Sequence, residues 1–213
     1  MRLGGLSGRF FRISEWISRL AYVNFLWLLF TLTGLVLLGI MPATVALFAV
    51  IRKWVLGKNE FSVFSVFWKT YRKEFVKSNF LGAVLVIFSF ILYVDLAFIP
   101  IEGIFFTLIR FGVLVISFLF LIVLLYIFPV YVHYDWKIGM YLKYAFILGA
   151  SYPHFTFGMM IGIFILYLIL TIVPGVIPFF SVSLLAFMIM WTANQVFKKA
   201  EGLTVTKTKT ESI

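Results

Sequence analysis

Three charged residues lie in or beside the longest apolar runs of the chain, where charge is costly to keep and often marks a site. Asp95 precedes a short loop expected near residue 100, Glu102 lies in that loop, and Arg110 follows in the next apolar run. An ion pair between Arg110 and either carboxylate would clamp two helices into a hairpin, whereas the same charges could contact a substrate or a gate. Glu102 could also simply face water. The sequence therefore predicts a candidate intramembrane polar cluster of Asp95, Glu102 and Arg110.

Few other residues could carry catalytic or metal chemistry. The chain has no cysteine and only two histidines, His133 and His154, with few carboxylates near them. A metal site is therefore not expected. No Ser-His-Asp order, HExxH motif, paired-carboxylate spacing or glycine-rich phosphate loop occurs in the sequence. We expect a protein that is not an enzyme and that carries no cofactor.

The composition is that of a membrane protein. Of the 213 residues, 63% are hydrophobic and only 12% are charged, whereas a soluble domain has about 25% charged residues. The net charge of +10 could suggest nucleic acid, but the charges lie between long apolar runs. That arrangement is typical of a membrane surface, where basic residues meet anionic headgroups, and not of a nucleic-acid-binding domain. The predicted fold is an all-α integral membrane protein.

The apolar runs predict one polytopic membrane domain over residues 1–200, with six transmembrane helices paired as three hairpins. The expected spans are 20–39, 42–57, 79–99, 104–131, 155–173 and 178–197. Amphipathic helices at 8–19, 61–77 and 136–150 are expected in the membrane interface, and 201–213 as a disordered tail. The second span would rise only about 22 Å, less than the roughly 30 Å hydrocarbon core, so whether it fully crosses is open.

The basic residues predict the orientation of the six spans. With six crossings, all but one of the 18 lysine and arginine residues fall on one side of the membrane. The positive-inside rule assigns that side to the cytoplasm, which places both termini inside. Five spans, or a re-entrant segment, would instead place one basic cluster outside.

The segment 61–77 combines an aromatic stripe with a basic stripe at helical spacing. The stripes form a candidate interaction surface of Phe61, Phe64, Phe67, Trp68, Lys69, Tyr71, Arg72, Lys73 and Lys77. The aromatic rings could anchor the helix in lipid while the cations meet anionic headgroups. Alternatively, the same surface could dock a cytoplasmic or membrane partner.

Four short motifs in the first half of the chain carry a family resemblance. They are Asn24-Phe-Leu-Trp27, the turn formed by Gly39, Pro42, Ala43 and Thr44, the pair Arg52-Lys53, and Phe67-Trp68-Lys69. With these motifs, residues 10–85 closely resemble the YesL family of bacterial membrane proteins, and residues 142–151 add a weaker likeness. The resemblance implies a polytopic protein commonly associated with carbohydrate ABC importers and their sensor-regulators. It carries over no catalytic residue.

Three functions are compatible with these features. The first is a non-catalytic accessory or scaffold of an oligosaccharide ABC import system, with the importer permease or a sensor protein as its partner. The second is a self-sufficient small transporter or channel that uses Asp95, Glu102 and Arg110. The third is a lipid-binding or signalling component whose basic segment binds anionic lipid headgroups. The oligomeric state is left open.

Overall fold

The computed structural model describes residues 6–100 and 103–210, and places side chains over 11–100 and 103–202. Within these ranges the chain contains helices and connecting turns but no strand. The elements are α1 (Leu6–Thr33), α2 (Ile40–Val55), α3 (Val63–Phe98), α4 (Ile104–His133), α5 (Ile138–Ser151), α6 (Pro153–Ile172), the short 3₁₀ turn η1 (Pro174–Val176) and α7 (Ile177–Thr210).

Five of the described helices are long and apolar enough to cross a membrane. They comprise Phe11–Thr33, Val63–Phe98, Ile104–His133, Pro153–Ile172 and Pro174–Gly202. This confirms an all-α integral membrane protein. The helix α2, which corresponds to the expected span 42–57, has 16 residues and a length of about 24 Å. A count of six crossings therefore stays a prediction.

The short helix α2 forms the centre of the fold. It packs against α1, α3, α4 and α7, and nine of its 16 residues are buried. Phe48 stacks on Phe128 of α4, with ring centroids 5.5 Å apart. Because neighbouring helices surround α2, protein rather than lipid covers most of its surface. Its apolar character therefore reflects helix packing as much as contact with the bilayer.

The turn between α1 and α2 begins earlier than the expected span boundary. The span expected over 20–39 ends as a helix at Thr33, and Gly34–Gly39 form a turn. Leu35 and Val36 adopt the left-handed region, with φ of 56° and 62°, which is unusual for side chains of this kind. The tight reversal requires glycine at both ends, because a Cβ on Gly34 would clash with Gly39 and a Cβ on Gly39 would clash with the backbone of Phe30 and Thr31.

The interfacial helices expected at 8–19 and 61–77 are not separate elements. Residues 8–19 continue into the first span as α1, and residues 63–77 form the first half of the 36-residue helix α3. Ser62 caps α3 by accepting a hydrogen bond from the Ser65 N–H at 3.3 Å. No proline follows within the helix, and the buried Gly82 lies against Met41 of α2. The backbone therefore has no reason to break near residue 78.

The C-terminal third follows the expected pattern with one difference. The helix α5 matches the segment expected at 136–150, and α6 matches the span at 155–173. The tail expected to be disordered from residue 201 instead extends α7 as helix to Thr210. No proline interrupts this stretch, so the helix can continue. Residues 211–213 lie outside the described part of the chain.

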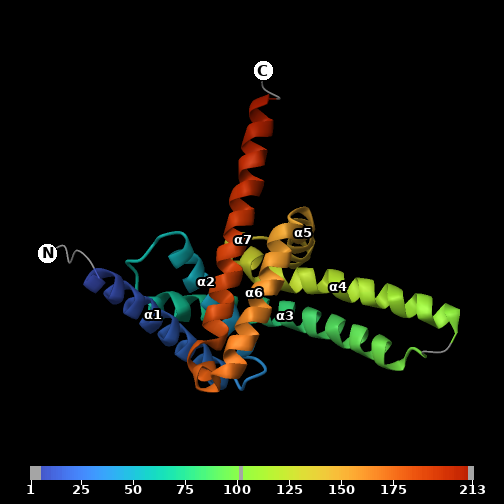
Figure 1. Ribbon diagram of the computed structural model, residues 1–213, viewed down its shortest axis with the longest axis horizontal. Helices are drawn as coiled ribbons and strands as arrows, with labels where there is room; N and C mark the ends of the chain where they lie inside the picture. The colour runs from blue at the N-terminus through green and yellow to red at the C-terminus, as the bar shows by residue number, and fades with distance from the viewer. Residues whose placement is uncertain (1–5, 101–102, 211–213) are drawn as a thin grey trace.

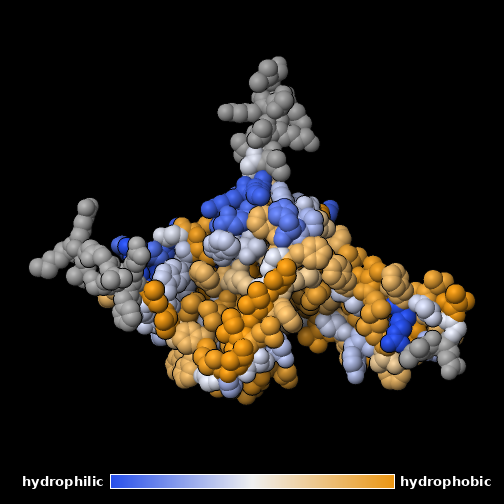
Figure 2. Space-filling model, in the orientation of Figure 1, coloured by the Kyte–Doolittle hydropathy of each residue, from blue (hydrophilic) through white to orange (hydrophobic). Residues whose placement is uncertain are grey.

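A projecting hairpin is the most prominent feature of the shape. Residues 83–98 of α3 and 104–121 of α4, here called the arm, run side by side away from the other helices (Figure 1). Between residues 103 and 121 no side chain is buried, and beyond Leu85 the only buried residue of α3 is Leu92. The arm surface is mostly hydrophobic, whereas hydrophilic residues gather where α7 leaves the bundle (Figure 2).

Candidate functional site

The candidate surface on α3 divides into a buried half and an exposed half. Phe67 and Tyr71 are buried in the core and pack on Phe30 of α1, with ring centroids 5.2 and 5.1 Å away. Phe61 and Phe75 are half-buried. The aromatic stripe therefore holds α3 against α1 and α2, which corrects the expectation of a helix lying free in the membrane interface.

The exposed half forms a compact basic patch, defined here by Trp68, Lys69, Arg72 and Lys73, which line a shallow depression. The Arg72 guanidinium lies 5.6 Å from the centre of the Trp68 ring, within range of a cation–π contact. Phe64, one turn earlier, is also exposed. Because the buried rings on the opposite side fix the helix, the patch sits on a rigid support.

The motif turn Gly39–Thr44 packs directly against this part of α3. The Trp27 indole donates to the Thr44 hydroxyl at 3.0 Å, and the Tyr71 hydroxyl donates to the Phe30 carbonyl at 3.1 Å. Asn79 donates to the carbonyl of Leu38 at 2.9 Å. Among the family-motif residues Gly39, Pro42, Ala43 and Thr44, Thr44 thus links α2 to α1, and Pro42 and Ala43 are buried in the core.

The intramembrane charges do not form the expected clamp. Asp95 and Arg110 both lie on the arm, and no ion pair joins them within the described residues. Glu102 lies outside the described residues. The arm therefore brings no complete polar cluster together.

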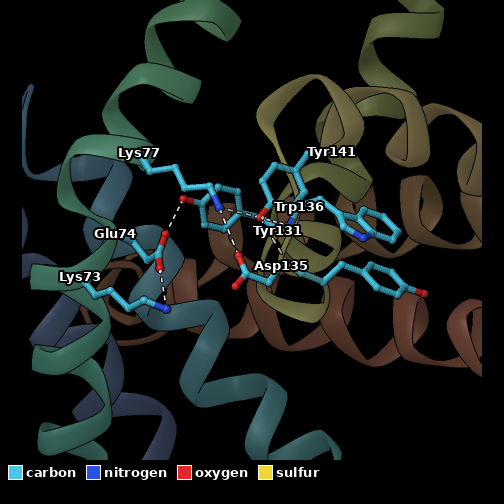
Figure 3. A network of polar contacts seen from close by, with 8 residues as sticks. Lys73, Glu74, Lys77, Tyr131, Asp135, Trp136 and Tyr141 are labelled. Carbon is cyan, nitrogen blue, oxygen red and sulfur yellow. Dashed lines mark hydrogen bonds and ion pairs between the residues drawn. The ribbon is translucent and has the colours of Figure 1, made fainter.

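A pocket of about 320 Å³ lies between α3 and the segment that joins α4 to α5. Figure 3 shows its polar contacts, with lysines of α3 facing residues 131–141. The Tyr131 hydroxyl donates to Glu74 at 2.8 Å, and the other carboxylate oxygen of Glu74 lies 3.6 Å from the Lys73 ammonium. Glu74 is thereby fixed in place by two partners, one from each wall.

Lys77 occupies the inner end of this pocket. Its ammonium donates to the Tyr141 hydroxyl at 2.9 Å and lies 3.5 Å from the Asp135 carboxylate. It also lies 5.3 and 5.0 Å from the ring centres of Tyr131 and Tyr141, where the ring faces attract a cation. The Trp136 backbone N–H donates to the Tyr141 hydroxyl at 3.0 Å. The aromatic walls and the carboxylate therefore hold this cation in a defined position.

A second polar chain joins α2, α4 and α7 beside the pocket. The Arg52 Nε donates to His133 Nδ1 at 3.5 Å, and His133 Nε2 lies 3.2 Å from Glu201. Since arginine can only donate, this geometry assigns the proton to Nε2, which donates to Glu201. Burial, with Glu201 nearby, raises the pKa of Tyr134 to about 12, so its hydroxyl stays protonated and donates to Glu201 at 3.3 Å.

The histidines serve as packing and hydrogen-bonding groups in this structure. His133 packs against Phe197 with ring centroids 4.4 Å apart, and His154 lies 4.4 Å from the Phe155 ring, one residue along α6. In the part of the chain that is described, no three metal-ligating side chains come together. The arrangement is thus one of fixed charges and aromatic rings, suited to binding.

The sequence predicted the lysines of this site but not the opposite wall. Glu74 is the one acidic residue within the basic stripe, and Tyr131, Tyr134 and Asp135 follow immediately after a long apolar run. A polar cluster at the end of such a run was the available signal. Tyr131 and its partner Glu74 on α3 are 57 residues apart along the chain, so only the fold reveals the pairing.

Comparison with known proteins shows that the chain is similar to proteins whose function is unknown. A family model described as "Protein of unknown function, DUF624" matches residues 20–96. The uncharacterized protein YteU of Bacillus subtilis (strain 168) is 44% identical over 201 residues, covering 94% of this chain and 90% of that protein. The uncharacterized protein YesL of the same organism is 39% identical over 193 residues, covering 87% and 88%. No solved structure matches the chain.

Proposed function

We propose that this chain, which belongs to the DUF624 family of YesL-like proteins of unknown function, is a non-catalytic accessory or scaffold of a carbohydrate ABC import system. In this proposal the chain lies in the bacterial plasma membrane with both termini in the cytoplasm. Its arm contacts the importer permease inside the bilayer. The basic patch is then free to meet a sensor protein at the membrane surface.

The observation that carries the proposal is the arm. Two apolar helices project from the bundle and expose side chains on every side, among them Phe90, Tyr93 and Phe111. Helices in a membrane usually associate by close packing against one another. A hairpin that no other helix in the described part of the chain covers is therefore suited to insert between helices of a partner.

Two further features support this reading. The family resemblance implies an association with carbohydrate importers and their regulators, which supplies the kind of partner. The basic patch supplies a contact surface that includes Trp68 and Arg72, residue types that are enriched in protein interfaces.

Affinity purification of the tagged full-length protein in a mild detergent tests the proposal. We expect the wild type to recover an ABC permease, its ATPase or a sensor protein. Substituting Phe90→Ala with Phe111→Ala should reduce that recovery roughly tenfold, since buried aromatic anchors dominate interface energies. Both side chains are exposed, so the fold should tolerate the change.

A matched control uses two exposed rings outside the arm. Phe157→Ala with Phe164→Ala on α6 likewise removes two exposed phenyl groups and should leave recovery unchanged. Recovery of no importer component by the wild type would refute the proposal. Equal loss in both variants would refute the assignment of the arm as the contact.

The transporter alternative has less support in this geometry. It would use Asp95, Glu102 and Arg110 along a substrate path, but Asp95 and Arg110 lie on the projecting arm. The polar pocket lies instead away from the arm, between the first half of α3 and residues 131–141. Substrate flux in proteoliposomes that disappears in Arg110→Ala would favour the transporter instead.

A further inference from the structure

The pocket between α3 and residues 131–141 has the size and lining of a small-ligand site. Its volume of about 320 Å³ lies at the lower end of the range for small-molecule pockets, roughly 300–1,000 Å³. Val45 and Ala49 of α2 contribute apolar surface, whereas lysine, tyrosine and carboxylate groups line the remainder. A compact polar group, and not an acyl chain, suits such a lining.

Three cations line one wall of this pocket. Lys69, Lys73 and Lys77 recur every four residues on α3, which places them on one face of the helix about 6 Å apart. Two carboxylates also line the pocket, Glu74 from the same helix and Asp135 from the opposite wall. The lysines therefore leave one positive charge without a carboxylate. Within the described residues, Lys69 has no hydrogen-bond or ion-pair partner.

The two carboxylates differ in how firmly they are held. Glu74 is half-buried and bonded to both Tyr131 and Lys73. The Asp135 side chain is 93% exposed and touches Lys77 only at 3.5 Å. An exposed, weakly held carboxylate can rotate into solvent at little cost. Its oxygen thus occupies the place that an anionic ligand oxygen would take beside the Lys77 ammonium.

We propose that this pocket binds a phosphoryl group, which displaces Asp135 from Lys77 and is also contacted by Lys69 and Lys73. A tetrahedral phosphoryl group presents oxygens in several directions, so it can meet ammonium groups on successive helical turns. Lysine binds phosphate as a point charge and needs no fixed planar geometry. The group belongs to either an anionic lipid headgroup or a soluble phosphate ester, and both sources share the same chemistry.

The pocket shares Lys69 and Lys73 with the basic patch, but it lies apart from the arm, which is the observation that carries the function proposed above. Failure of the purification experiment would leave the pocket untouched, and failure of phosphoryl binding would leave the arm contact untouched. The two proposals are therefore tested by different variants and different measurements.

The experiment uses the full-length protein in phosphatidylcholine nanodiscs. One measurement adds inorganic phosphate, with chloride at matched ionic strength as the reference, and follows binding by calorimetry. The other replaces part of the phosphatidylcholine with phosphatidylglycerol and counts retained lipid by native mass spectrometry. Phosphate binding without retained phosphatidylglycerol assigns a soluble ligand, and retained phosphatidylglycerol assigns a headgroup. The absence of both signals would overturn the proposal.

The lysines are tested with a charge-matched control. Lys69→Gln with Lys73→Gln should weaken binding about tenfold or more, since each charged contact contributes on the order of 1.5 kcal/mol. Lys58→Gln with Lys143→Gln removes the same charge from exposed lysines outside the pocket and should change binding by less than about twofold. Equal losses in both pairs would indicate diffuse attraction and overturn the site.

A substitution at Asp135 is expected to tighten binding, a result that misfolding cannot produce. Replacing Asp135→Asn removes the competing carboxylate from Lys77 while keeping its shape, so binding should tighten by about threefold or more. The side chain is almost fully exposed, so the fold should be unaffected. Unchanged or weaker binding in this variant would show that no anion takes the place of Asp135, and the proposal would fail.

Discussion

Gly39 is required by close packing and not by backbone torsion. Its φ of −85° lies in the ordinary helical region, so any residue could adopt it. A Cβ at this position, however, would lie 2.5 Å from the Thr31 carbonyl oxygen and 2.8 Å from that of Phe30. Both obstacles are backbone atoms, which cannot rotate away as a side chain would. The glycine therefore sets the distance between α1 and α2.

We expect Gly39→Ala to lower the free energy of unfolding by about 2 kcal/mol or more, because α1 and α2 must move apart. Thermal unfolding in detergent should show an apparent Tm lower by roughly 4–8 °C. Gly139→Ala is the matched control, since nothing lies within 4 Å of its added Cβ. An unchanged Tm for Gly39→Ala would show that the helices can separate freely.

Single buried polar side chains find the partners that their chemistry requires. Asn24 donates to the Pro178 carbonyl at 2.7 Å while accepting from the Ser183 N–H at 3.1 Å, because a buried amide must find partners. The Asp95–Arg110 pair was wrong for the described residues, since neighbouring helices do not by themselves turn two side chains toward each other.

At the scale of elements, α3 determines how the bundle and the arm are joined. Its first half runs along α2 and supports the basic patch, and its second half leaves the bundle with α4. One continuous helix thus connects the core, the pocket wall and the arm. Its 36 residues correspond to about 54 Å, well beyond the roughly 30 Å hydrocarbon core.

Spin labels can test whether α3 is continuous, and the absence of native cysteine makes labelling specific. In a variant carrying Ser65→Cys and Phe90→Cys, both at exposed positions, the two Cα atoms should lie about 37 Å apart. Pulsed electron paramagnetic resonance measures this distance, and singly labelled variants give the intermolecular background. A distance shorter by 10 Å or more, or a bimodal distribution, would indicate a break near residue 78.

Hydropathy predicted where most helices lie but not how they join. An aromatic face at helical spacing looks the same whether it meets lipid or another helix, so Phe67 and Tyr71 were assigned to a membrane surface instead of the core. The pocket was missed for a related reason. Tyr131, Asp135 and Tyr141 approach α3 only because α4 packs beside α2, a contact between distant segments that periodicity cannot encode.

At the scale of the whole molecule, the central question is how the short helix α2 relates to the bilayer. Its ends carry Gly39 at one side and Arg52 with Lys53 at the other. The surrounding helices cover most of its surface, so a mismatch in length need not expose its backbone to lipid. A buried helix of this length can therefore connect the two sides even though it is shorter than the hydrocarbon core.

We predict six crossings with both termini in the cytoplasm, because this arrangement keeps nearly all basic residues on one side. A fluorescent protein that folds only in the cytoplasm should be active when fused to either terminus of the full chain. Alkaline phosphatase, active only outside, should be silent at both. Opposite signals at the two termini would instead indicate an odd number of crossings, with α2 failing to traverse.

The arm joins the bundle at its base, just beyond Gly82, which lies against Met41 of α2. Its own two helices are held together by Phe88 and Phe120, whose ring centroids lie 4.7 Å apart. Mechanically it is a cantilever. From Gly82 to the tip at Phe98 the helix measures about 24 Å, so a rotation of about 10° at the base would sweep the tip through about 4 Å. A small repacking around Met41 would therefore become a lateral displacement large enough for a neighbouring membrane protein to sense.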